Sequence, residues 1–158
     1  MLNLNEDQEK RARELHDKSI FFDAHCDTIL SVLSGERTLN ERSDQGHIDI
    51  PRLKDGGIDA QIFSVFVRPE WYHDAAHATL KGISVLKKEL QKGFKNVTLA
   101  RNASDIIKAA KEGKIAALLS IEGGEALQGD LDMLRIYHEL GVTSLVLTWN
   151  HRNSIADG

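Results

Sequence analysis

From residue 58 onward the sequence alternates between short apolar runs and longer segments whose apolar residues have helical spacing. Continuously apolar runs are typical of strands buried on both faces of a sheet, and helices between such strands connect them in parallel. The pattern therefore predicts an α/β fold with a parallel sheet. The expected strands cover 58–67, 96–100, 115–124 and 143–150, and the expected helices cover 71–93, 104–114 and 130–141.

The N-terminal third is expected to add a helix, a strand and a loop. Residues 5–17 predict a short polar helix lying across one end of the fold, and residues 19–27 predict a buried strand. Residues 34–57 form a long loop that contains Pro51. Loops of this length are usually functional or disordered, so we expect a flap over a site or poor order.

Two α/β architectures fit this alternation. An open doubly wound sheet is complete with five strands. A (β/α)8 barrel typically needs about 250 residues, so a chain of 158 residues would hold only its first five strands. Periodicity alone does not separate these architectures, and in either case residues 1–158 form part or all of one domain.

The composition limits the classes of partner. Hydrophobic residues make up 41% and charged residues 28% of the chain, as in globular domains. A net charge of -4 gives no electrostatic reason to expect nucleic acid or an anionic membrane as a partner, and no apolar segment is long enough to span a bilayer. Cys26 is the only cysteine, which excludes an internal disulfide and favours a reducing compartment, the cytoplasm.

Ionisable residues stand at the ends of three expected strands: His25 with Asp27, Glu122, and His151 just past the last strand. The carboxyl ends of parallel strands form the active-site face of α/β folds. Side chains two residues apart on a strand point the same way, so His25 and Asp27 could share a zinc ion, while Cys26 faces the helices. Glu122 could bridge two metals, and His151 could donate a hydrogen bond to a substrate carbonyl.

Each of these residues also has a simpler interpretation. A lone pair such as His25 and Asp27 is more often hydrogen-bonded in a loop than bound to metal. Glu122 could be a solvated residue before a Gly-Gly turn, and His151 a surface-loop histidine. Arg152 and Asp157 could contact a substrate or form a local salt bridge.

Four segments together resemble the renal (membrane) dipeptidase family of zinc peptidases, most closely its soluble bacterial members. They occur in the family's order and at appropriate spacing, from about residue 19 to the last residue. The segments are "FDAHCDTIL", "HIDIPRLKDGGIDAQIFSVFV", "SIEGGEAL" and "LTWNHRNSIADG".

The resemblance implies a (β/α)8 barrel with two zinc ions at its C-terminal mouth. It implies that His25 and Asp27 bind one zinc, that Glu122 bridges both and is catalytic, and that His151 binds the substrate and acts on its scissile carbonyl. A metal-bound hydroxide would then attack the peptide carbonyl of a dipeptide, without an acyl-enzyme. The family's two further histidine ligands, its arginine for the substrate carboxylate and its proton-transferring aspartate have no match here.

A half barrel has physical consequences. Open sheet edges and an uncovered apolar interior predict self-association or a need for the missing C-terminal half. With a partial zinc site, we expect an inactive or weakly active fragment of a metallodipeptidase. The alternatives are another metal-dependent barrel amidohydrolase, which usually begins with HxH rather than HxD, and a non-catalytic α/β interaction module.

Overall fold

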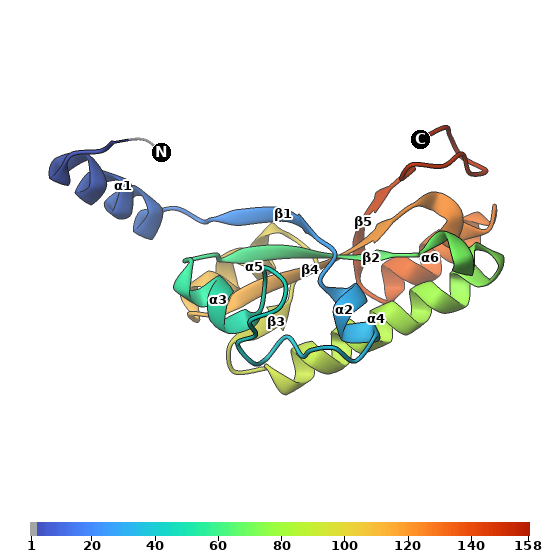
Figure 1. Ribbon diagram of the computed structural model, residues 1–158, viewed down its shortest axis with the longest axis horizontal. Helices are drawn as coiled ribbons and strands as arrows, with labels where there is room; N and C mark the ends of the chain where they lie inside the picture. The colour runs from blue at the N-terminus through green and yellow to red at the C-terminus, as the bar shows by residue number, and fades with distance from the viewer. Residues whose placement is uncertain (1–2) are drawn as a thin grey trace.

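A computed structural model describes residues 3–158, which form one parallel sheet with helices packed mainly against one of its faces (Figure 1). The strands are β1 (Phe22–Cys26), β2 (Ala60–Phe66), β3 (Val97–Leu99), β4 (Ile115–Glu122) and β5 (Val142–Val146). The helices are α1 (Glu6–Lys18), α2 (Ile29–Leu33), α3 (Ile50–Asp55), α4 (Ala75–Lys92), α5 (Ala103–Lys111) and α6 (Leu131–Glu139), with 3-10 turns η1 (Pro69–Asp74) and η2 (Gly124–Leu127). The predicted parallel α/β class is confirmed.

The strand order shows that β3 does not lie between β2 and β4, although it comes between them in the sequence. β1 pairs with β2, and β2 pairs with β4 along its whole length, from Ala60 opposite Ala116 to Phe66 opposite Glu122. On the other edge of β4, β3 pairs only with the first residues and β5 only with the last. Consecutive neighbours are therefore β1, β2, β4 and β5, as in a curved barrel wall, and β3 is a short addition at the start of β4.

The main core lies between the sheet and the helices. Phe63, Leu119 and Ile121 project from the strands into this layer and are fully buried. α4 approaches β2 closely because residue 82 is glycine: a Cβ there would lie 2.5 Å from Cγ1 of Val65. On the other face, a smaller alanine-rich cluster packs under α5 and covers only the first half of the strands.

β1 differs from the buried strand predicted over 19–27. Only Cys26 is buried, whereas Phe21 and Phe22 are 40% and 45% exposed, because β1 lies at the sheet edge with one neighbour. Cys26 faces the core as predicted, and burial raises the pKa of its thiol to about 11. This thiol is thus held in its neutral form at physiological pH.

The predicted N-terminal helix is confirmed, but its predicted position is wrong. α1 projects away from the sheet rather than lying across an end of the fold, and none of its residues is buried (Figure 1). Asn5 and Gln8 form a capping box at its start. Near its end, His16 stacks on Phe21 and its Nε2 lies 3.0 Å from the carbonyl of Gly57.

The segment over 34–57, predicted as a long loop, contains the helix α3 (Ile50–Asp55) and is neither a flap nor poorly ordered, because buried carboxylates fix it. Asp49, which is 0% exposed, accepts hydrogen bonds from the backbone N–H of Ser43 at 3.1 Å and from Nε of Arg52 at 2.7 Å. Its Oδ2 also lies 3.3 Å from Nη2 of the buried Arg37. Burial alone would raise the pKa of Asp49, but the hydrogen bonds from Arg52 and Ser43 hold this pKa below its usual value.

Glu89 of α4 is the second anchor of this loop. Its carboxylate accepts from the backbone N–H of Leu39 at 2.8 Å and from the hydroxyl of Thr38, and it pairs with Lys92. Burial opposes ionisation of Glu89, yet the bonds from Lys92, Thr38 and Leu39 lower its pKa. Since Glu89 stands near the C-terminal end of α4, the loop is tied to the end of the sheet where the strands begin.

Two predicted boundaries need correction. The helix expected over 104–114 is α5 (Ala103–Lys111), and Asn102 caps its start by accepting a hydrogen bond from the N–H of Asp105 at 3.0 Å. The last strand ends at Val146 rather than residue 150, since the carbonyl of Leu147 leaves the ladder to accept from the N–H of Gly124.

In the part of the chain that the structure describes, no helix combines the length and apolar character that crossing a membrane would require.

Candidate metal centre

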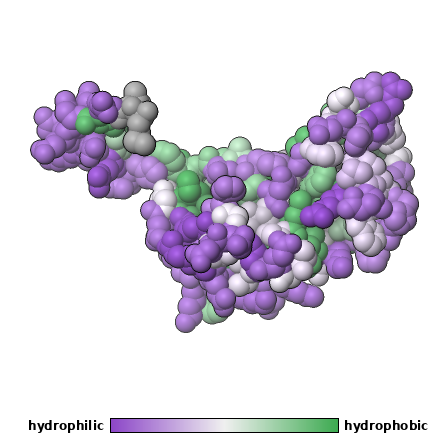
Figure 2. Space-filling model, viewed as in Figure 1, coloured by the Kyte–Doolittle hydropathy of each residue, from purple (hydrophilic) through white to green (hydrophobic). Residues whose placement is uncertain are grey.

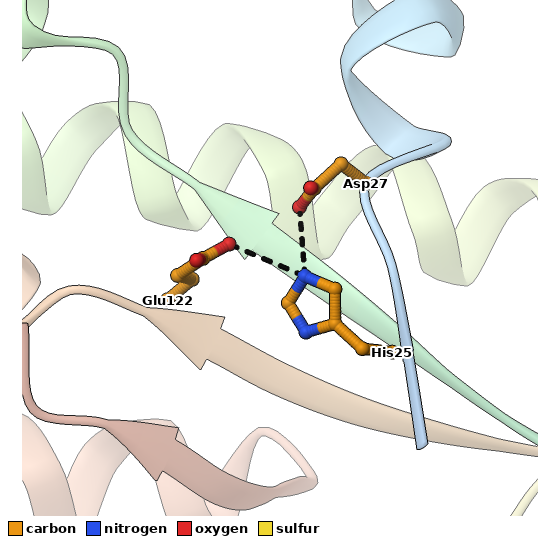
Figure 3. A group of neighbouring side chains, drawn as sticks. All are labelled: His25, Asp27 and Glu122. Carbon is orange, nitrogen blue, oxygen red and sulfur yellow. Dashed lines mark ion pairs between the residues drawn. The ribbon is translucent and has the colours of Figure 1, made fainter. Parts of the chain in front are cut away.

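Three side chains from two strands converge at the carboxyl end of the sheet (Figure 3). His25 comes from β1, Asp27 follows that strand directly, and Glu122 is the last residue of β4. One donor atom from each lies within 4.8 Å of the others. Nε2 of His25 is 3.4 Å from Oδ1 of Asp27 and 3.3 Å from Oε2 of Glu122.

These separations fit the donor set of a zinc ion. Zinc holds imidazole nitrogen and carboxylate oxygen at about 2.0–2.1 Å with tetrahedral angles, which separates two ligands by about 3.3–3.4 Å. The two measured distances match that spacing and are longer than ordinary hydrogen bonds. The residues present therefore fit one metal ion with an open position.

A β-bulge in β1 sets the direction of His25. Asp23 is opposite Gln61 and Cys26 is opposite Phe63, so β1 has one more residue than β2 between these pairs. The Asp23 carboxylate accepts from the backbone N–H of His25 and from the buried Gln61 amide, each at 3.0 Å. Bulges commonly redirect a side chain next to a functional site, and here Asp23 fixes the bulge.

Glu122 is the most buried of the three groups, with its side chain 15% exposed. Burial raises the pKa of this carboxyl, the negative charge of Asp27 raises it further, and His25 partly opposes both effects. Gly123 then turns the chain with a φ of 99°, a conformation that favours glycine. A cation between the three groups would relieve the repulsion between the two acids.

His151 does not belong to this group of donors. Its exposed ring contacts two aromatic rings edge-on, with centroids 5.8 Å from Trp149 and 6.4 Å from Tyr72. Trp149 in turn packs at 4.8 Å against Phe66, which is the register neighbour of Glu122 on β2. His151 therefore does not contact the three candidate ligands directly. Trp149 lies between His151 and Phe66, the neighbour of Glu122 in the sheet.

The local salt bridge expected between Arg152 and Asp157 is present, with Nη2 and Oδ2 2.6 Å apart. The sequence interpretation missed three residues that shape the site: Asp23, Tyr72 and Trp149. An acid within an apolar run was the only available signal for Asp23. Tyr72 and Trp149 have no signal in the sequence, because their contacts depend on how η1 and the segment after β5 are placed by the tertiary fold.

Comparison with known proteins supports one family. Residues 9–158 match the model of the membrane dipeptidase family, peptidase family M19. Dipeptidase tcpJ of Claviceps purpurea is 31% identical over 71% of this chain and 28% of its own length. An uncharacterised Acinetobacter calcoaceticus protein is 26% identical over 87% of this chain and 51% of its own length.

Among solved structures, a family M19 dipeptidase has a TM-score of 0.76 at 25% identity, over 83% of this chain and 43% of that one. A metallopeptidase from Rhodobacter sphaeroides, liganded with a phosphinate mimic of L-Ala-D-Ala, has a TM-score of 0.74 at 25% identity. It covers 84% of this chain and 46% of its own. The chain spans about half or less of the length of the proteins it matches, and it belongs to the membrane dipeptidase family, peptidase family M19.

Proposed function

We propose that residues 1–158 are the N-terminal part of one metallodipeptidase barrel domain and supply its first metal-binding groups. The supporting observation is the convergence of His25, Asp27 and Glu122 at zinc-ligand spacing. His25, Asp27 and Glu122 would hold one zinc ion, and Glu122 would also serve as a ligand of a second. A bound zinc ion lowers the pKa of a coordinated water and so supplies a nucleophile at neutral pH.

The substrate proposed is a dipeptide. The dipeptide mimic in the Rhodobacter sphaeroides relative supports this substrate class. His151, held by Trp149 and Tyr72, would donate a hydrogen bond to the scissile carbonyl as negative charge builds on its oxygen. The proposed location, the cytoplasm, rests on the single cysteine and stays a prediction.

This proposal is tested by binding and turnover together. In calorimetry, the phosphinate mimic of L-Ala-D-Ala should bind the 158-residue chain only when zinc is present. In the Glu122→Gln variant, adding zinc at the same concentration should no longer promote binding of the mimic. Dipeptide hydrolysis by the same chain should be very slow, because four further functional groups expected of the family have no match. Mimic binding unaffected by zinc would contradict the proposed function, and fast turnover would contradict only the weak activity.

The proposed partners are a second copy or the rest of a barrel. The outer edges of β1 and β5 have no strand partner among the described residues. Exposed apolar side chains lie on α6 and near the end of β5, with Leu131 67%, Ile136 50% and Leu147 52% exposed. Figure 2 shows apolar surface along the β1 side and below the C-terminal segment. Water-exposed apolar surface of this kind favours association.

Sedimentation velocity should therefore show concentration-dependent self-association of the isolated chain. Val146→Lys places a charge on the exposed outer edge of β5 and should shift the chain toward monomer, since charges on edge strands block pairing. Leu15→Lys on the projecting α1 adds the same charge at a similarly exposed apolar residue and serves as control. A wild-type chain that stays monomeric at every concentration would refute this partner proposal.

A further inference from the structure

A pocket of about 310 Å³ lies between α2, the end of β2, η1 and the first turns of α4. Its walls are mainly apolar: Leu30 and Leu33 come from α2, Phe66 and Val67 from the end of β2, and Trp71 from η1. Trp71 is 53% exposed at this pocket, and its ring stacks on that of His73 with the centroids 6.0 Å apart. Mostly apolar concave sites of this size, with a few polar groups, are typical of small-molecule sites.

The pocket is next to the metal centre but does not share its residues. Leu30 follows Asp27 by three residues, and Phe66 is the register neighbour of Glu122. None of the three candidate metal ligands lines the pocket. A ligand held by these lining residues would therefore not need the metal for its binding.

The charges lining the pocket are mainly positive. Arg68 and Lys81 both line it, and neither has an ion-pair partner within residues 3–158. The one acid there, Asp74, lies 3.1 Å from Nδ1 of His77, which also lines the pocket. Two cationic side chains that are unpaired in the described part of the chain, Arg68 and Lys81, therefore lie beside an apolar cavity, whereas the one acid, Asp74, is paired with His77.

We infer that this pocket binds a small amphipathic carboxylate, with the apolar body between α2 and η1 and the carboxylate near Arg68 and Lys81. The apolar walls favour burial of a hydrocarbon or aromatic group, and the cations favour a charge-assisted bond to the anionic end. Two sources have this chemistry: the C-terminal residue of a peptide with a large side chain, and a medium-chain fatty acid. The inference does not depend on the proposed peptidase activity.

Calorimetric titration of the metal-free 158-residue chain distinguishes these sources. N-acetylphenylalanine represents the C-terminal residue of a peptide, and octanoate represents a fatty acid. The compound that binds with the lower dissociation constant identifies which of these two ligands the pocket prefers. Octanol and octylamine have a similar apolar body without the negative charge and should bind at least about fivefold more weakly than octanoate. Equal binding of octanol and octanoate, or no binding of either carboxylate at millimolar concentration, would overturn the inference.

Variants locate the site. Arg68→Gln and Lys81→Gln should each weaken carboxylate binding by about three- to fivefold. Ala78→Leu should weaken it by filling the cavity that Ala78 lines. Lys88→Gln, an exposed lysine on the same helix outside the pocket, is the matched control and should change nothing. Glu122→Gln should retain carboxylate binding in the pocket even where it removes zinc binding. The test of the pocket is therefore independent of the test of the metal centre. Equal losses in Lys81→Gln and Lys88→Gln would place binding elsewhere.

Discussion

Replacing Asp49 with alanine should lower the free energy of unfolding by about 3–5 kcal/mol, a large fraction of the 5–15 kcal/mol typical of a domain. The carboxylate is fully buried and is the shared acceptor for Ser43 and Arg52. Its removal would also leave the guanidinium of Arg37, with its side chain 3% exposed, without its ionic partner. Breaking a buried pair in this way leaves an uncompensated charge in the core.

Urea unfolding followed by circular dichroism measures this loss. Asp44→Ala removes an exposed acid from the same loop and should stay within about 0.5 kcal/mol of wild type. The pKa of Asp49 is lowered in the folded state, so its contribution is present above the ordinary value of 3.8 and is lost as the pH falls through the lower folded pKa. Equal stability of the two variants at pH 7 would show that Asp49 does not anchor the loop.

Replacing Glu122 with glutamine should weaken zinc binding by at least about 100-fold, since even groups that only orient metal ligands contribute 10- to 100-fold. The amide keeps the shape of the side chain but removes the negative charge that faces His25 and Asp27 at the candidate site. Competition with a chromophoric chelator measures the affinity. Zinc should also raise the melting temperature of the wild-type chain more than that of this variant, because ligand binding stabilises the folded state.

Glu125→Gln makes the same chemical change three residues later, outside the three-residue group, and should keep zinc affinity within a few-fold of wild type. This control separates ligation from a general loss of negative charge near the strand ends. Equal zinc affinity in the wild-type chain and in Glu122→Gln would contradict the assignment of the metal centre and, with it, the proposed function.

The sequence predicted the elements that depend on local patterns. Strands such as β2 and β4 are apolar throughout, and α4 and α6 have apolar residues at helical spacing, so their existence and order follow from the chain. The place of β3 could not be predicted, because strand pairing is set by tertiary packing. The loop over 34–57 was also misjudged, since its order depends on Asp49 and on Glu89, which lies far away in the sequence.

At the candidate site, residue types at strand ends identified the groups that converge. Parallel strands bring their carboxyl ends together, so His25, Asp27 and Glu122 were expected at one edge. The bulge at Asp23 was not foreseen, because regular alternation along the strand was assumed. The surroundings of His151 depend on where β5 ends and on the ring of Tyr72, and neither follows from a periodic pattern.

The division of one edge of β4 between two strands separates the structural roles of its two ends. The first residues of β4 carry β3, and the last residues carry β5 and Glu122. The register with β2 is unbroken between them. Insertions or deletions within 97–111 would therefore change the end of the sheet where β4 begins, and would leave the ligand-bearing end in place.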